Sequence, residues 1–176
     1  MSKENADKEQ KRSFKREVFS WIACIVVTIL LTEFILNFVI INANIPSGSM
    51  ENTIMTNDKL IALRTSYWFN DPKRGDIIIF KYPDDETEWF IKRVIALPGE
   101  TVLVKDGKVY INGSKKALSE PYIKEEPVED FGPYKVPKNG YFVMGDNRNN
   151  SNDAREWETH YVSRDEVLGK AWFRYY

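Results

Sequence analysis

Cysteine and histidine are almost absent from this chain. It has a single cysteine, Cys24, and a single histidine, His160, among 176 residues. A lone cysteine can form no internal disulfide and no cysteine-based metal site. A zinc site would then depend on carboxylates almost alone, which is unusual for zinc in proteins. The sequence therefore points away from a metal, and we expect no cofactor of any other kind.

An excess of basic residues is also missing. The chain carries 25 Lys and Arg against 26 Asp and Glu, and its formal net charge is −1. No basic stripe stands out, so the composition argues against a nucleic-acid partner. Hydrophobic residues make up 43% of the chain, which is enough for a globular core. The length corresponds to one ordinary domain plus a smaller segment.

One long apolar run is present at residues 21–41, which read WIACIVVTILLTEFILNFVII. A helix needs about 20 apolar residues to cross the hydrocarbon core of a bilayer. Glu33 is the only charged residue of the run, and no polar face recurs at the helical period, which disfavours a buried helix of a soluble protein. A cleavable signal peptide would be shorter and would end in an Ala-x-Ala site, which INANIPSGS lacks. We therefore predict a retained membrane anchor at residues 19–41.

The charges around this run predict its orientation. Six Lys and Arg residues stand between positions 3 and 16, whereas positions 42–55 carry none. Basic residues mark the cytoplasmic side of membrane helices. We therefore expect residues 1–18 to be a cytoplasmic segment and residues 42–176 to form an extracytoplasmic domain. The anchor would then lie in the lipid of the cell membrane.

The rest of the chain consists of short segments rich in Val, Ile, Phe, Tyr and Trp, separated by turn residues. They cover residues 59–69, 75–82, 88–97, 100–105, 107–113, 140–146 and 167–176. Asp106 and Gly107 form a two-residue turn that is typical of a hairpin. Residues 114–139, with four prolines, predict an exposed loop with short extended pieces. The predicted fold class is mainly β: an all-β domain behind one N-terminal transmembrane helix.

Two serines flank a glycine in IPSGSM, residues 45–50, and raise the question of a nucleophile. The usual base for a serine nucleophile is histidine, but His160 lies in a distant polar segment. A lysine can replace it if burial disfavours the charged form of the amine. Lys92 fits, because in a strand it would share one face with Phe90 and Val94. An edge-strand lysine with its amine in water is the alternative reading of the same pattern.

A third stretch, GDNRNNSNDAR at residues 145–155, is densely polar. It follows the apolar segment GYFVM, so its side chains could supply buried hydrogen bonds beside a strand. Taken alone, it is equally typical of a solvated loop. Its meaning therefore depends on the other two blocks.

Together, the three blocks resemble those of the type I signal peptidases of bacteria, which are membrane-anchored Ser/Lys endopeptidases. PSGSM is similar to the block that carries the family's nucleophile, RGDIIIF and FIKRVIALPGE to the block with its lysine, and GDNRNNSNDAR to its C-terminal box. The order and spacing agree from the anchor to about residue 172. The single anchor and the short connection between the second and third blocks resemble the compact form found in Gram-positive bacteria.

The resemblance implies a role for each matched residue. Ser49 would be the nucleophile and Lys92 the general base. The Ser47 hydroxyl and the Ser49 backbone N–H would form the oxyanion hole, and Ser151 would orient the lysine. The residues expected to support the site structurally are Asp146, Arg148, Asp153 and Arg155. The implied substrates are signal peptides of secreted preproteins, with small residues just before the cleavage point, and the resemblance implies no metal.

The chain departs from the family pattern at Asn52, where a proline is usual, and we expect a less stiff loop after Ser49. One alternative function is that of a catalytically silent relative that helps to assemble surface proteins, although such members have lost the serine or the lysine. Another is a self-cleaving Ser/Lys regulator joined to a DNA-binding domain. The anchor and the missing helix-turn-helix pattern argue against that second alternative. The oligomeric state stays open.

Overall fold

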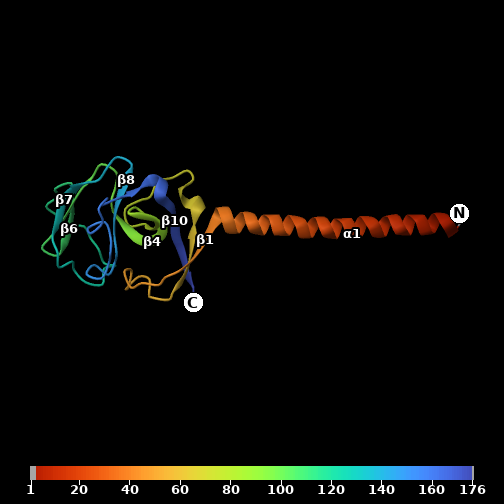
Figure 1. Ribbon diagram of the computed structural model, residues 1–176, viewed down its shortest axis with the longest axis horizontal. Helices are drawn as coiled ribbons and strands as arrows, with labels where there is room; N and C mark the ends of the chain where they lie inside the picture. Colours follow the sequence, from red (N-terminus) through yellow and green to blue (C-terminus); the bar gives the residue numbers. More distant parts are fainter. Residues whose placement is uncertain (1–2, 176) are drawn as a thin grey trace. The chain divides into compact units, whose positions relative to one another are not determined.

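The computed structural model describes the backbone of residues 3–175 and the side chains of residues 14–175 (Figure 1). The chain divides into two compact units, Met1–Val39 and Ile40–Tyr176.

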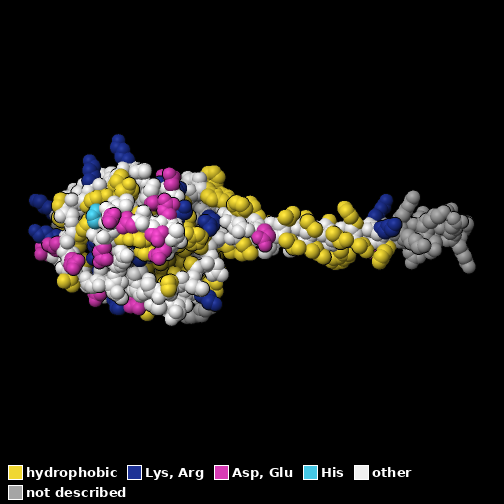
Figure 2. All heavy atoms as spheres, viewed as in Figure 1, with side chains coloured by type: hydrophobic (Ala, Val, Ile, Leu, Met, Phe, Trp, Pro, Cys, Tyr) yellow, Lys and Arg dark blue, Asp and Glu magenta, His cyan; other side chains and the backbone are white. Residues whose placement is uncertain are grey.

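The first unit is a continuous helical stretch. It consists of α1 (Lys3–Phe34) and a π-helical end at Ile35–Val39. Apolar side chains cover much of its surface (Figure 2). The part from Phe14 to Val39, 26 residues, is long and apolar enough to cross a membrane. This finding fits the predicted anchor.

The polar side chains inside this stretch bond locally. Thr28 and Thr32 donate their hydroxyl groups to the carbonyls of Cys24 and Thr28, at 2.9 Å each. The Asn37 amide donates to the Glu33 carbonyl at 2.8 Å and to its carboxylate at 3.1 Å. An unsatisfied polar group is costly in the hydrocarbon core of a bilayer. These local bonds therefore make the polar residues compatible with a membrane-spanning helix.

The second unit is built from two antiparallel sheets. The larger sheet has seven strands in the order β1-β2-β10-β3-β4-β8-β9, and the smaller has three in the order β6-β5-β7 (Figure 1). The strands are β1 (Ile40–Asn44), β2 (Lys59–Leu63), β3 (Ile77–Tyr82), β4 (Asp85–Ala96), β5 (Thr101–Lys105), β6 (Lys108–Ile111), β7 (Phe131–Lys135), β8 (Gly140–Met144), β9 (Val162–Ser163) and β10 (Val167–Tyr175). Short 3-10 helices lie at Arg64–Tyr67 and Arg164–Glu166.

The central part of β3, residues 78–80, and the second half of β4, residues 91–96, are buried on both faces. Ile78, Phe80 and Val94 belong to one core cluster, whereas Ile79 and Ile91 belong to a second. Successive side chains of a strand point to opposite faces, so a continuous apolar run such as IIIF requires a cover on each side. A polar side chain within this part of β4 is therefore withdrawn from water.

The predicted hairpin is confirmed. Lys105 of β5 faces Lys108 of β6, and the two residues between them, Asp106 and Gly107, have φ values of 49° and 74°. Positive φ at both central positions is the geometry of the type I′ turn that suits a two-residue hairpin. Asp and Gly adopt it with little strain.

One local prediction was wrong. The segment at residues 59–69 is not one strand: β2 ends at Leu63 and a 3-10 helix follows. The segment at residues 114–139 is mostly irregular and contains one short extended piece, β7, as predicted, although Pro127 within it is buried. The predicted mainly β class nevertheless holds.

Candidate active site

Ser49 stands in the connection between β1 and β2, on the nucleophile loop, by which we mean residues 45–54. The next residue, Met50, is fully buried, and Ile54 is nearly so. The loop backbone closes on itself, since the Glu51 N–H donates to the Gly48 carbonyl at 3.1 Å and the Ile54 N–H to the Met50 carbonyl at 2.8 Å. Two apolar anchors and these turn bonds fix the backbone that carries the Ser49 hydroxyl.

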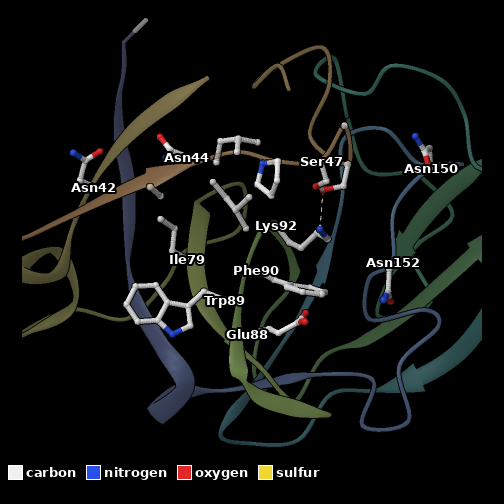
Figure 3. Close-up of a pocket in the computed structure, with 16 residues that line it drawn as sticks. Asn42, Asn44, Ser47, Ile79, Glu88, Trp89, Phe90, Lys92, Asn150 and Asn152 are labelled. Carbon is white, nitrogen blue, oxygen red and sulfur yellow. Dashed lines mark hydrogen bonds between the residues drawn. The ribbon is translucent and has the colours of Figure 1, made fainter. Parts of the chain in front are cut away.

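The Lys92 amine meets the Ser49 hydroxyl at 2.8 Å, Nζ to Oγ (Figure 3). Lys92 is only 4% exposed and Ser49 only 6%. The Phe90 ring centroid lies 5.2 Å from Nζ, as expected for a neighbour on the same face of β4. The alternative of an edge lysine with its amine in water is therefore wrong.

Burial changes the acid–base behaviour of this amine. It lowers the pKa of Lys92 from its ordinary value of 10.5 to about 8, and the negative charge of Asp153 opposes part of that shift. Near pH 8, an appreciable fraction of the amine is thus neutral and able to accept a proton. The arrangement is that of a serine hydroxyl with an adjacent base.

His160 is held elsewhere in the fold. Its Nδ1 lies 2.8 Å from the Ala154 carbonyl oxygen, and its ring packs against Phe131 and Tyr134 at centroid distances of 5.2 and 5.5 Å. It does not line the cleft that contains Ser49. Within the described residues, the amine that bonds to the Ser49 hydroxyl is that of Lys92.

Ser47 is brought to the nucleophile as well. Its Oγ lies 3.4 Å from the Ser49 Oγ, and both residues line the same cleft. When Ser49 attacks a carbonyl carbon, a hydroxyl at this distance can rotate and donate a hydrogen bond to the carbonyl oxygen. The predicted oxyanion role has a suitable geometry and stays a prediction.

Ser151 lies beside the pair without a bond to either member. It is 7% exposed, and its hydroxyl has no hydrogen-bond partner among the described residues. The Ser151 hydroxyl and the Ser49 carbonyl oxygen both lie against Gly145. A Cβ at position 145 would clash with both of them. A buried hydroxyl without a partner is uncommon. Its predicted role in orienting Lys92 stays a prediction.

Asp153 organises the polar box, by which we mean residues 145–155. It is fully buried and accepts the Gly145 N–H at 3.0 Å and the Arg155 Nε at 2.8 Å. Arg155 also donates from Nη2 to the Arg148 carbonyl at 2.5 Å. The box is therefore a bonded unit and not a solvated loop.

The other two predicted support residues form buried ion pairs with partners outside the box. Asp146 accepts both Nε and Nη2 of Arg93, at 2.8 and 2.6 Å. Arg148 binds both carboxylate oxygens of Glu120, at 2.7 and 3.0 Å, and donates from Nε to the Gly145 carbonyl at 2.9 Å. Two-point contacts of this kind fix direction as well as distance.

Asn147 holds the backbone at the nucleophile. Its N–H donates to the Ser49 carbonyl at 3.0 Å, and its side-chain amide donates to the Gly48 carbonyl at 2.9 Å. Because a serine side chain is short, these bonds help to determine where the Ser49 hydroxyl lies.

Three residues of the site were not predicted from the sequence: Arg93, Glu120 and Asn147. Arg93 had a usable signal, because it follows Lys92 in a stretch that reads as buried, and a buried guanidinium requires a carboxylate. Asn147 lies in a block already singled out for its polarity. Glu120 lies in a proline-containing segment, and no pattern there predicts its burial.

The Ser49–Lys92 pair lies in a cleft of about 710 Å³. Its walls are residues 42–49 on one side and residues 88–92 of β4 on the other, with Ile79, Asn150 and Asn152. Strand β8 pairs with β4 only from Arg93 onward. In the described part of the chain, residues 88–91 of β4 therefore have no strand beside them on that side, and this backbone edge lines the cleft. Figure 3 shows Trp89 on one side of this edge and Phe90 and Glu88 on the other. An extended peptide can pair with such an edge.

Comparison with known proteins identifies the family. Residues 18–176 match the family described as "Signal peptidase, peptidase S26". The chain belongs to this family. A probable signal peptidase I-2 of Synechocystis sp. is 44% identical over 156 residues, which are 86% of this chain and 70% of the relative. A signal peptidase I of Bacillus amyloliquefaciens is 38% identical over 157 residues, which are 84% of this chain and 82% of the relative.

A solved structure agrees with the fold. The crystal structure of a signal peptidase I from Enterococcus faecalis has a TM-score of 0.50 and 36% sequence identity with this chain. The match covers 57% of this chain and 97% of the solved one. The predicted resemblance to type I signal peptidases and the mainly β class are thus confirmed.

Proposed function

We propose that this chain is a membrane-bound serine endopeptidase that removes signal peptides from exported preproteins. The observation that carries the proposal is the hydrogen bond of 2.8 Å between the buried Lys92 amine and the Ser49 hydroxyl. The pair lies in a cleft of about 710 Å³ that is lined by residues 88–92 of β4. The relatives named signal peptidase I support the choice of substrate.

The reaction begins with neutral Lys92. Its amine takes the proton of the Ser49 hydroxyl while the oxygen attacks the carbonyl carbon of the scissile peptide bond. The carbonyl electron pair moves to the oxygen and gives a tetrahedral oxyanion. The Lys92 ammonium then donates its proton to the leaving nitrogen, the C–N bond breaks, and the new N-terminus departs. An ester between the signal peptide and Ser49 remains.

Hydrolysis of the ester repeats the sequence with water. Neutral Lys92 takes a proton from the water molecule as it attacks the ester carbonyl, and Ser49 regains its proton when the C–O bond breaks. The signal peptide leaves as a carboxylate. Both oxyanions would accept hydrogen bonds from the Ser47 hydroxyl and the Ser49 backbone N–H, and Ser151 would orient the amine.

The predicted anchor at residues 19–41, most of which belongs to the apolar helix Phe14–Val39, would hold the enzyme in the membrane with residues 1–18 in the cytoplasm. The support for this orientation is the excess of Lys and Arg before the helix. The cleft would then lie outside the cell, on the side where exported chains emerge. The catalytically silent alternative has no observation in its favour, since both Ser49 and Lys92 are present and adjacent.

The direct test uses the purified full chain in detergent with a secretory precursor. We expect the wild-type chain to shorten the precursor by its signal peptide and Ser49→Ala to leave it intact. Ser66→Ala, a half-buried serine of a 3-10 helix outside the cleft, is the matched control and should cleave normally. An intact precursor after incubation with the wild-type chain would contradict the function. Cleavage by Ser49→Ala would contradict the nucleophile.

A further inference from the structure

One irregular segment touches both halves of the site. Residues 119–124, which we call the strap, lie between β6 and β7 and belong to no strand or helix. The strap contacts the polar box, the Arg93 side chain and the nucleophile loop. These contacts are made by side-chain or backbone groups of Glu120, Tyr122, Ile123 and Lys124.

Glu120 fixes the strap to the polar box. Its two carboxylate oxygens bind the two terminal nitrogens of Arg148, and the side chains are 6% and 0% exposed. The Tyr122 hydroxyl donates to the same carboxylate at 3.1 Å. Farther along, the Lys124 N–H donates to the Asp146 carbonyl at 2.9 Å. The strap and the box are therefore joined at both ends of the strap.

Tyr122 covers the residue next to the base. Its ring lies 3.9 Å from the Arg93 guanidinium carbon, in the geometry of a cation–π contact. Arg93 follows Lys92 in β4 and holds Asp146 by two bonds. The ring thus covers the arginine of the ion pair that ties β4 to the box.

Asn52 ties the nucleophile loop to the strap. Its side-chain amide donates to the Tyr122 carbonyl at 3.0 Å and lies 3.4 Å from the Ile123 carbonyl oxygen. Asn52 has φ 88°, a left-handed conformation that asparagine tolerates better than most residues and that proline cannot adopt. Beside it, Glu51 pairs with Lys124 at 2.8 Å on the surface. The loop is therefore tethered three residues after Ser49.

We infer that the strap is a positioning element and that Asn52 and Tyr122 are positioning residues for the reaction. They fix the backbone of the nucleophile loop relative to β4, and so fix the Ser49 Oγ relative to the Lys92 Nζ. The short serine side chain cannot compensate for a displaced backbone. This inference rests on the proposed function. The loop after Ser49 was expected to be less stiff because of Asn52, but the Asn52 side chain tethers it to the strap.

The test compares three variants at positions with left-handed backbone. Asn52→Asp keeps size and backbone preference, but a carboxylate cannot donate to the two carbonyls. Asn52→Gly keeps the backbone freedom and removes the side chain. Asn57→Gly is the matched control, because Asn57 also has a positive φ, 72°, and its side chain forms no hydrogen bond in the described part of the chain.

Steady-state cleavage of a peptide substrate by the full chain gives the readout. Displacement of a reacting atom by about 1 Å can reduce the rate by about 10²-fold, so we expect kcat to fall by about 10- to 10²-fold in both Asn52 variants. KM should stay within about twofold, because the cleft itself is unchanged. Asn57→Gly should keep wild-type kcat. The melting temperatures of the Asn52 variants should match that of Asn57→Gly, since both residues are exposed.

A second pair tests the same tether from the other side. Tyr122→Phe keeps the ring on Arg93 and loses only the hydroxyl bond to Glu120, so its kcat should fall less than that of Tyr122→Leu. Tyr122→Leu removes the ring, and its kcat should fall at temperatures well below its melting point. Wild-type kcat in both Asn52 variants, or losses that only follow the melting temperature, would overturn the inference. The proposed function would survive that result, because it depends on cleavage by the wild-type chain and on its loss in Ser49→Ala.

Discussion

Lys92 stands on a regular strand, whereas Ser49 stands on an irregular loop, and the chain holds the two by different means. Lys92 is set by strand pairing, with Ile78 opposite it in β3, and by the apolar side chains that bury it. Ser49 is set by hydrogen bonds from Asn147 to the backbone around it and by buried anchors such as Met50. In the proposed roles, Lys92 as the base needs a dry environment and Ser49 as the nucleophile needs a fixed position, and each residue lies where its requirement is met.

The strongest test of this contrast replaces the base without removing its charge. Arg keeps the positive charge but cannot become neutral in a protein. We expect Lys92→Arg to show no detectable cleavage of a precursor or peptide. Lys81→Arg, on the exposed part of β3, is the control and should be normal. Substantial activity in Lys92→Arg would remove Lys92 from the reaction.

The next largest effect should come from the second serine of the cleft. Ser47→Ala keeps the covalent route but removes one donor to the oxyanion. We expect kcat to fall by about 10²–10³-fold with little change in KM, because the oxyanion forms only near the transition state. Single-turnover acylation kinetics would check the step. A wild-type rate in Ser47→Ala would refute the donor role and leave the nucleophile untouched.

A smaller effect should appear in stability. Replacing Lys92 should abolish activity but stabilise the folded chain. The pKa of Lys92 is lowered in the folded chain to about 8, from an ordinary 10.5. Between these values the unfolded chain binds more protons, so stability rises with pH across that window; below it, the buried charge destabilises the fold. At pH 7, Lys92→Met should therefore be more stable than wild type by on the order of 1–3 kcal/mol.

Thermal melts from pH 7 to pH 10 would check this. The difference between Lys92→Met and wild type should shrink as pH rises above about 8. A constant difference over the whole range would mean that the amine is not perturbed by burial.

The contrast between a regular strand and an irregular loop also explains which parts of the site could be predicted from the sequence. Lys92 and its neighbour Phe90 were predictable because strand alternation is a local rule that depends on residues two positions apart. The hairpin at Asp106 and Gly107 was predictable because Asp-Gly is itself a local turn signal. Ser49 had no such signal of its own and was selected by the resemblance of its block to a family.

The contacts that hold the nucleophile loop could not be predicted locally. Glu120 and Arg148 are far apart in the sequence, and their pairing depends on the path of a segment without regular structure. The prolines of residues 114–139 indicated an irregular path but not that it returns to the site. Asn52 suggested a looser loop, because its bond to the strap becomes visible only when residues 122 and 123 lie beside it.

The pH dependence of kcat/KM tests the central claim that a buried, partly neutral Lys92 is the base. The substrate should be a peptide without groups that titrate between pH 6 and pH 10. We predict that kcat/KM rises with the loss of one proton and a midpoint of about 8, and that His160→Asn leaves this midpoint in place. A midpoint near 10.4, the value of a lysine in water, or a profile that is flat across this range would contradict the account.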